Sequence, residues 1–289
     1  MLPDFLCIGA QRSGTTWLDS HLRRHPEIWL SPLKEIRYFG CPREPYILKV
    51  FANDPRVRGS ARRRWRDAIA AIRASDSVTM SWAVRFCFLP RNDHWYASLF
   101  RPSKDQVAGD ITPGYSTLSQ GEVCRIHGLL PDARIIYLLR NPIERIWSQA
   151  SQYFGRYVSP NLREVGFQHI SRFLDSPNPH RHTDYLGTLQ KWESCYPGDQ
   201  LHIGFLEEIT RAPVRFLRET LAFLGVDSNR DYLPDRLEHK VNKGSYPSMP
   251  EHLSHRLALR YYGPIIELHD RFDNEYTAKW VSFARRYLS

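Results

Sequence analysis

Short apolar runs alternate along the chain with segments whose apolar residues recur every three or four positions. The apolar runs with the length of buried strands lie at 5–8, 133–139 and 201–205. Helical patterns follow these runs at 17–22, 142–154 and 207–224. Strands that alternate with helices in this way form parallel sheets covered by helices on both faces. The pattern therefore predicts an α/β fold of three layers around a central parallel sheet.

The remaining periodicity completes this picture. Further helices are predicted at 93–101, with Asp93 as a candidate N-cap, and at 119–130, 184–195, 253–272 and 277–287. Pro264 is expected to kink the longest of them. A short strand at 106–110 leads into a Pro-Gly turn, and the turn-rich segment at 175–182 is expected to be a mobile loop. Since no repeat, low-complexity segment or linker interrupts the chain, residues 1–289 are expected to form one domain.

A glycine-bounded loop follows the first apolar run. Gly9 and Gly14 enclose this loop, and Thr15 and Thr16 begin the helical pattern. A strand, a glycine loop and a helix N-terminus together present free N–H groups and the positive end of the helix dipole to an anion. The sequence therefore predicts a phosphate-binding site at this turn.

The residues of this loop differ from those of a nucleotide triphosphatase. That motif has lysine where this chain has Thr15, and the cation lies inside the loop as Arg12. The strand at 133–139 ends in Arg140, where a triphosphatase commonly places a magnesium-binding aspartate. A guanidinium repels Mg²⁺ and attracts phosphate. We therefore expect a phosphorylated nucleotide with two separate anionic ends, bound without a metal.

A second cluster of polar residues surrounds the turn after that strand. Asn141 is expected as the N-cap of the next helix, with Pro142 as its first residue. Arg140 at the strand tip and Ser148 two helical turns later would clamp a second phosphate. For Arg145 we favour an ordinary position on the helix surface.

Two further places carry candidate substrate-facing residues. Lys34, Glu35 and Arg37 stand next to an aromatic pair, and they form either an acid–base and charge-stabilising group beside the phosphate loop or a solvated surface turn. Asp110 is predicted at a strand end, where open α/β sheets bind ligands, and its alternative role is to cap the following turn.

The chain is basic, with a formal net charge of +9, which predicts an anionic ligand or surface. The arginine-rich segment at 62–66 fits nucleic acid or an acidic glycan, and an exposed basic helix face is the simpler interpretation. The glycine turn at 240–247 contains Lys243 and Gly244, which either close over a nucleotide or form a plain surface loop.

Cysteine usage and hydropathy bear on the compartment. The five cysteines lack CxxC spacing, which argues against a zinc site or a disulfide framework and favours a reducing compartment. No run approaches about 18 consecutive apolar residues, so no membrane span is predicted. The strand-like start at Phe5 leaves no room for a signal peptide, and a cytoplasmic protein is expected. His180 and His182 lack the spacing of a metal pair, so we interpret them as loop residues that face the substrate.

Four segments resemble those of the sulfotransferases that use 3′-phosphoadenosine 5′-phosphosulfate (PAPS), in the branch that contains heparan sulfate sulfotransferases and related bacterial enzymes. These segments are GAQRSGTTW at 9–17, EIRYF at 35–39, LRNPIERIWS at 139–148 and NKGSYP at 242–247. Their order and spacing match over nearly the whole chain. The resemblance implies the nucleotide-hydrolase-like P-loop fold of the sulfotransferases.

The resemblance also implies roles for individual residues. The 5′-phosphosulfate would be held by Arg12, Ser13, Gly14, Thr15, Thr16 and Trp17, and the 3′-phosphate by Arg140, Ser148, Lys243 and Gly244. Glu35 matches the carboxylate proposed as base in O-sulfating members. Arg12, which stands where many members carry lysine, would balance charge on the leaving group. Apart from the resemblance, the candidate acceptor-facing residues are Lys34, Arg37 and Asp110, and Arg37 stands where several members have histidine.

The implied reaction is in-line transfer of a sulfuryl group from PAPS to a hydroxyl, with an amine less favoured, leaving 3′,5′-diphosphoadenosine and requiring no metal. The acceptor is expected to be a glycan, a glycolipid or a small metabolite. Two alternatives remain. A P-loop nucleotide kinase or triphosphatase would need Mg²⁺ and a loop lysine, and a basic nucleic-acid-binding protein would show strongly salt-dependent affinity.

Overall fold

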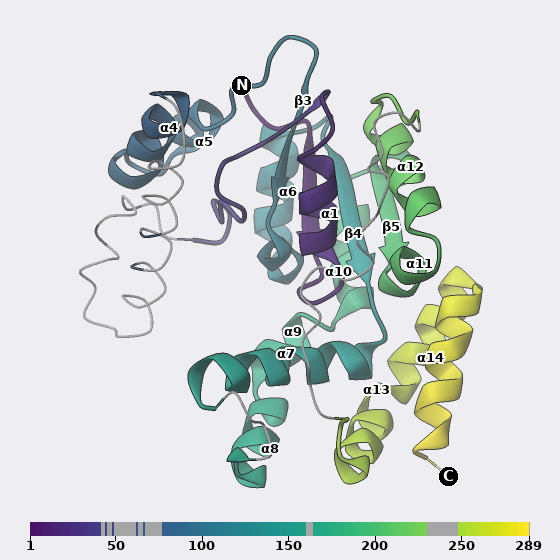
Figure 1. The fold of residues 1–289 in the computed structure, drawn as a ribbon. Helices are drawn as coiled ribbons and strands as arrows, with labels where there is room; N and C mark the ends of the chain where they lie inside the picture. The colour runs from purple at the N-terminus through teal and green to yellow at the C-terminus, as the bar shows by residue number, and fades with distance from the viewer. Residues whose placement is uncertain are drawn as a thin grey trace.

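The structure is a computed structural model of the chain, drawn in Figure 1. It describes residues 1–41, 77–159, 164–229 and 248–288, together with positions 44, 48, 62 and 66. Most of the arginine-rich segment at 62–66 and the whole turn at 240–247 lie outside the described residues. The predictions for Lys243 and Gly244 therefore lie outside them too.

A parallel sheet forms the centre of the described chain. Its strands are β1 (Phe5–Gly9), β2 (Ile28–Leu30), β3 (Val107–Ile111), β4 (Arg134–Leu139) and β5 (Leu201–Phe205). They lie in the order β2-β3-β1-β4-β5, and every pair of neighbours is parallel. The predicted α/β fold with a central parallel sheet is confirmed. β2 escaped prediction because a strand of three residues is too short to show a period.

Helices cover both faces of the sheet (Figure 1). One face carries α1 (Thr15–Leu22), α11 (Leu206–Arg211) and α12 (Pro213–Leu224). The opposite face carries α6 (Gln120–Leu129), α7 (Pro142–Tyr157) and α10 (Tyr185–Glu193). Successive strand residues point to opposite faces. Phe5 and Cys7 therefore pack on the face that carries α1, whereas Leu6 and Ile8 pack on the face that carries α7. A strand buried on both sides is apolar at every position, as the first run of the sequence is.

The other described helices extend the layer that contains α6, α7 and α10. They are α4 (Ser77–Phe88), α5 (Asp93–Ser98), α8 (Phe167–Asp175), α9 (Pro177–Arg181), α13 (Glu251–Phe272) and α14 (Glu275–Arg286), and short 3₁₀ turns occur at η1 (Pro113–Thr117) and η3 (Gly198–Gln200). Pro264 lies inside α13, which is assigned as one helix. Trp280 of α14 is buried in the same core as Leu139 at the end of β4. Burying such a large apolar side chain contributes roughly 2–3 kcal/mol to the free energy of unfolding.

Two local predictions differ from the structure. The segment at 175–182, expected to be a loop, contains the helix α9, because Pro177 takes the first helical position and Pro179 is buried beneath it. The N-cap of α5 is Asn92 rather than Asp93: the Asn92 side chain accepts a hydrogen bond from the N–H of Trp95 at 2.8 Å. The carboxylate of Asp93 instead accepts a hydrogen bond from the hydroxyl of Tyr38 at 2.6 Å.

Candidate active site

Four chain segments leave the sheet at its carboxyl-terminal edge. They are the loop at 10–14 after β1, the segment at 31–39 after β2, Thr112 after β3 and Arg140 after β4. Because all these strands are parallel, the four segments emerge at the same edge, where sheets of this kind bind ligands. β1 lies between β3 and β4, so its loop is flanked by segments that come from both sides of the sheet.

Arg12 joins the glycine loop to the helix that follows β4. Its Nε donates a hydrogen bond to the Oγ of Ser148 at 3.0 Å, although the two residues are 136 positions apart. Arg140 donates from Nη1 to the carbonyl oxygen of Arg12 at 3.4 Å. The two clusters that the sequence predicts as separate phosphate sites therefore lie directly beside each other.

The loop enters the N-terminus of α1 through a left-handed backbone. Arg12 and Gly14 have left-handed conformations, with φ of 73° and 98°. Gly14 is the N-cap of α1, and a Cβ at this position would lie 2.9 Å from the Cδ1 of Ile209. The first N–H groups of a helix have no partner within the helix, and the positive end of the dipole lies there. The loop therefore leads into a helix N-terminus of the kind that binds anions, and the phosphate site itself stays a prediction.

The side chains of the loop divide between core and surface. Ser13 and Thr15 are buried, whereas Thr16 is exposed. The indole of Trp17 packs in the core, with its ring centroid 4.2 Å from that of His21 and 6.1 Å from that of Phe216. The side chain of Trp17 therefore contributes to packing, and the cofactor contact predicted for this residue would have to come from its backbone.

Arg145 lies in the interior, contrary to the surface position that the sequence favoured. Its guanidinium donates to the Oγ1 of Thr183 at 2.9 Å, to the side-chain oxygen of Gln149 at 2.7 Å, to the carbonyl of Pro179 at 2.8 Å and to the carbonyl of Gln11 at 3.3 Å. Burial lowers the pKa of Arg145 to about 10. These oxygen acceptors compensate for burying the cation, which holds the glycine loop against the end of α9.

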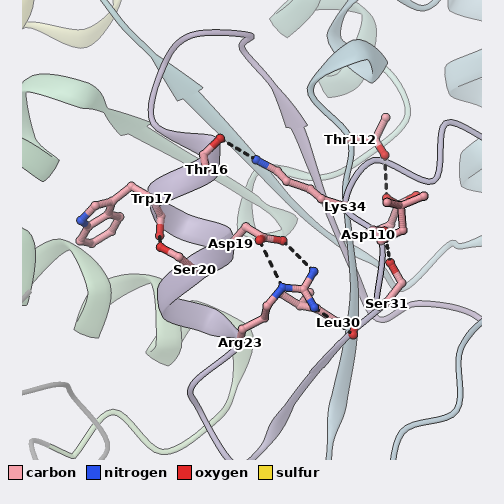
Figure 2. A network of polar contacts seen from close by, with 11 residues as sticks. Thr16, Trp17, Asp19, Ser20, Arg23, Leu30, Ser31, Lys34, Asp110 and Thr112 are labelled. Atoms are coloured by element: carbon pink, nitrogen blue, oxygen red, sulfur yellow. Dashed lines mark hydrogen bonds and ion pairs between the residues drawn. The ribbon is translucent and has the colours of Figure 1, made fainter. Parts of the chain in front are cut away.

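Lys34 reaches from the segment after β2 to the first turn of α1 (Figure 2). Its Nζ donates a hydrogen bond to the Oγ1 of Thr16 at 3.0 Å. Burial lowers the pKa of Lys34, while Asp19 and Glu35 act in the opposite direction. Figure 2 also shows Asp19 held by Arg23, the residue that caps the end of α1. Lys34 therefore brings a second cation to the phosphate loop.

Glu35 and Arg37 form an ion pair at the edge of the site. The Nε of Arg37 donates to the Oε2 of Glu35 at 2.9 Å, and its Nη2 contacts the same oxygen. Both residues have positive φ, 63° and 54°, a conformation that costs non-glycine residues on the order of 1 kcal/mol each. Arg91 holds this backbone by donating to the carbonyl of Arg37, and the N–H of Arg37 donates to the Oγ1 of Thr112 at 3.4 Å.

Asp110 is buried beneath the site, and its side chain is 1% exposed. Its carboxylate accepts hydrogen bonds from Thr112 at 2.7 Å, Tyr115 at 2.8 Å and Tyr96 at 3.0 Å. Burial raises the pKa of Asp110 and these hydroxyl donors lower it. The predicted contact with substrate needs an accessible side chain, so we assign Asp110 a positioning role. It holds Tyr115, whose hydroxyl in turn accepts the N–H of Tyr38 at 3.0 Å.

His182, which the sequence predicts as a loop residue facing the substrate, lies at the end of α9. Its Nδ1 is buried and makes no hydrogen bond within the described part of the chain. Burial lowers the pKa of His182 to about 4, and the charges of Arg145 and Arg37 contribute. Glu35 acts in the opposite direction. The ring is therefore neutral near pH 7 and lies within electrostatic range of the Glu35–Arg37 pair.

A cavity of about 330 Å³ opens beside the junction of Arg12 and Ser148. Its lining includes Arg140, Glu144, Trp147, Ser148, Phe283 and Tyr287. The Nε of Arg140 is buried and has no hydrogen bond among the described residues. The cavity combines a cationic donor with aromatic side chains, which suits a ligand that has both an anionic group and a flat ring.

The described residues contain neither a metal-binding cluster nor a helix that could span a membrane. No three His, Cys, Asp or Glu side chains among them are grouped as a metal ion would require. None of the helices that the structure describes is sufficiently long and apolar to span a membrane.

A sequence model described as the sulfotransferase family matches residues 3–230. The chain is 25% identical over 268 residues to a bifunctional heparan sulfate N-deacetylase/N-sulfotransferase of Drosophila melanogaster, a match that covers 85% of this chain and 22% of the relative. It is 34% identical over 135 residues to heparan sulfate glucosamine 3-O-sulfotransferase 6 of Mus musculus, covering 46% of this chain and 39% of the relative. The chain thus spans well under half the length of these curated relatives.

A solved structure supports the fold over nearly the whole chain. The sulfotransferase from Alicyclobacillus acidocaldarius superposes with a TM-score of 0.66 at 23% identity. The superposition covers 97% of this chain and 99% of that one.

Proposed function

Because the chain belongs to the sulfotransferase family, we propose that it transfers a sulfuryl group from PAPS to a hydroxyl of an acceptor. The observation that carries this proposal is the junction of Arg12, Ser148 and Arg140, which brings two cationic strand ends together at one edge of the sheet. One nucleotide with an anionic group at each end matches that arrangement.

The residues at the junction fit such a donor. We assign the 5′-phosphosulfate to Arg12, Ser13, Gly14, Thr15, Thr16 and the backbone of Trp17, and the 3′-phosphate to Arg140 and Ser148, joined by Lys243 and Gly244. The buried Nε of Arg140, which has no hydrogen bond among the described residues, is a donor that suits a phosphate oxygen. Trp147, Phe283 and Tyr287 supply aromatic surface for the adenine in the same cavity.

Bound PAPS supplies the sulfuryl group, and the side chains of this protein do the rest. Glu35 accepts the proton of the acceptor hydroxyl, and Arg37 orients its carboxylate by donating to Oε2. Arg12 and the backbone N–H groups of the loop stabilise the charge that develops on the leaving oxygen, an effect of about 3 kcal/mol per donor. Lys34 adds to that stabilisation through Thr16. No step requires a metal ion.

The proposed acceptor is a carbohydrate-containing molecule. Two relatives are named for heparan sulfate, one as a 3-O-sulfotransferase and one as an N-sulfotransferase. A hydroxyl acceptor is favoured because Glu35 provides a carboxylate base next to the donor loop. Sulfation of an amine and of a small non-sugar metabolite are the second and third choices.

The test is transfer of ³⁵S from labelled PAPS to a panel of saccharides, glycolipids, amines and small alcohols, with and without a chelator. The proposal expects chelator-resistant transfer to at least one sugar hydroxyl. Calorimetry separates the alternatives: tighter binding of ATP–Mg²⁺ than of 3′,5′-diphosphoadenosine would indicate a kinase or triphosphatase. Steeply salt-dependent binding of DNA or RNA without nucleotide binding would indicate a nucleic-acid-binding protein.

A further inference from the structure

Two accessible thiols lie next to each other outside the candidate active site. Cys124 lies on α6, Cys195 follows the end of α10, and their Sγ atoms are 2.9 Å apart. All the cysteines are free thiols. Cys124 is exposed and Cys195 is partly exposed, whereas Cys7 and Cys87 are buried in the core. A bonded pair of sulfurs is about 2.0 Å apart, so these two need to approach by only about 0.9 Å to form a bond.

The surroundings of the pair favour a reactive thiolate. The side-chain nitrogen of Gln120 lies 3.4 Å from the Sγ of Cys124 and 3.5 Å from that of Cys195, and it donates to the Oγ of Ser194 at 2.7 Å. Hydrogen bonds from Cys195 and from Gln120 lower the pKa of the Cys124 thiol, because both stabilise the thiolate. Burial and the neighbouring thiol raise the pKa of Cys195. Cys124 is therefore suited to attack first and Cys195 to react second.

We propose that Cys124 and Cys195 are a redox-active pair that closes to a disulfide under mild oxidation and joins α6 to the end of α10. The oxidant is of the peroxide class. The Cys124 thiolate attacks one peroxide oxygen, which forms a sulfenic acid and releases hydroxide, and Cys195 then attacks that sulfur and displaces water. In total, two thiols lose two electrons and two protons, and hydrogen peroxide becomes two molecules of water.

The disulfide would fasten a helix that supports the active site. The hydroxyl of Tyr185, at the start of α10, donates to the carbonyl of Arg140 at 2.9 Å, and Thr188 donates to the carbonyl of Ser116 at 2.9 Å. The cross-link joins residues 71 positions apart, which restricts the unfolded chain strongly. We expect the midpoint of thermal unfolding to rise by roughly 5–10 °C, which matches the usual effect of a disulfide closing a loop of that length.

The experiment uses the full chain and equimolar hydrogen peroxide. After alkylation and digestion without a reductant, mass spectrometry is expected to detect one cross-linked peptide pair that contains Cys124 and Cys195. Calorimetry is expected to show the increase in the unfolding midpoint, and dithiothreitol should reverse it. Cys124→Ser and Cys195→Ser should each abolish the peroxide-dependent change, whereas Cys41→Ser should retain it.

Each comparison is made within one variant before and after peroxide, so a variant that is less stable from the start still gives a result. Oxidation of Cys124 to the sulfinic acid with Cys195 left reduced would overturn the proposal. A disulfide between two chains, or a cross-link without any rise in the unfolding midpoint, would overturn it as well. No readout involves sulfuryl transfer, so the outcome is independent of the proposed function.

Discussion

The Nε of Arg12 donates a hydrogen bond to the Oγ of Ser148 across 3.0 Å, and this bond connects the two strand-to-helix turns of the candidate site. Neither turn by itself identifies the ligand, since a glycine loop alone suits any phosphate and an arginine at a strand tip suits many anions. Side by side, they bring the guanidinium groups of Arg12 and Arg140 to one edge of the sheet. Such preorganisation reduces the entropy that nucleotide binding must overcome.

Arg140→Ala should weaken binding of 3′,5′-diphosphoadenosine by about 10- to 100-fold, because it removes a charge-assisted donor to the 3′-phosphate. Adenosine 5′-monophosphate lacks that phosphate, so its affinity should change much less. Titration calorimetry with both nucleotides checks this, and Arg218→Ala on α12 serves as the matched control. An equal loss for the two nucleotides would place the role of Arg140 elsewhere.

Glu35→Gln should lower kcat by about 10²–10⁴-fold, the usual contribution of a general base, and leave the affinity for 3′,5′-diphosphoadenosine within about twofold of the wild type. The amide retains the shape of the side chain and removes its basicity. Single-turnover transfer assays provide the rate, and calorimetry provides the affinity. A variant with full activity would exclude Glu35 as the base.

Lys34→Arg should extend activity to higher pH. Burial lowers the pKa of Lys34, so its positive charge is lost at a lower pH than for an exposed lysine, whereas an arginine remains charged throughout. The alkaline limb of the kcat/KM profile should therefore shift upward in this variant. Lys279→Arg, an exposed position on α14, is the control. Superimposable alkaline limbs for Lys34→Arg and wild type would show that the charge of Lys34 is not required.

Arg145→Met should reduce the free energy of unfolding by about 2–5 kcal/mol, because the buried acceptors of its guanidinium lose their donors. Urea denaturation measures the change. Arg156→Met, an exposed position on the same helix, should stay within about 0.5 kcal/mol of the wild type. Similar effects at the two positions would contradict the interior position of Arg145.

Stability should fall as the pH decreases from about 6.5 toward 4. His202 is held neutral by burial, with its pKa lowered to about 4, and its Nε2 lies 3.2 Å from the Oγ1 of Thr220. The unfolded chain, in which the pKa of histidine is about 6.5, binds the proton first, so each such histidine removes up to about 3 kcal/mol by pH 4. His182 behaves in the same way.

Urea titrations at pH 7 and at pH 5 give the slope of stability against pH. His202→Gln should be less sensitive to acid than the wild type, while His94→Gln, at an exposed position, should leave the slope unchanged. Identical slopes for wild type and His202→Gln would mean that other groups cause the loss of stability in acid.

Local signals explain what could be predicted from the sequence. The side chain of Asn141 accepts from the N–H groups of Ile143 and Glu144, as an asparagine before proline at a helix start predicts. Asp184 caps α10 in the same manner. The apolar runs at 5–8 and 133–139 became the central strands β1 and β4, which are buried on both faces, whereas the run at 201–205 became the partly buried edge strand β5.

Features that depend on distant segments could not be predicted. Arg145 is buried because Thr183 and Gln11, each more than 30 positions away, supply oxygen acceptors, and no spacing in the sequence encodes that. The hydroxyl donors that enclose Asp110 include Tyr96 from α5, which precedes the strand. The sequence does not distinguish a carboxylate that is exposed at the end of a strand from one that is buried there. Contact with substrate and a positioning role were therefore equally compatible with Asp110.

Arg145 also ties the glycine loop to the segment that follows α9. One guanidinium donates to the carbonyl of Gln11 in the loop and to the hydroxyl of Thr183, next to His182. Substitutions around α9 that remove these acceptors should therefore disturb the glycine loop as well, and with it the nucleotide affinity that we propose for the loop. Arg145 makes none of these bonds to the segment that carries Glu35 and Arg37. Substitutions in that segment should therefore change acceptor choice with less effect on nucleotide affinity.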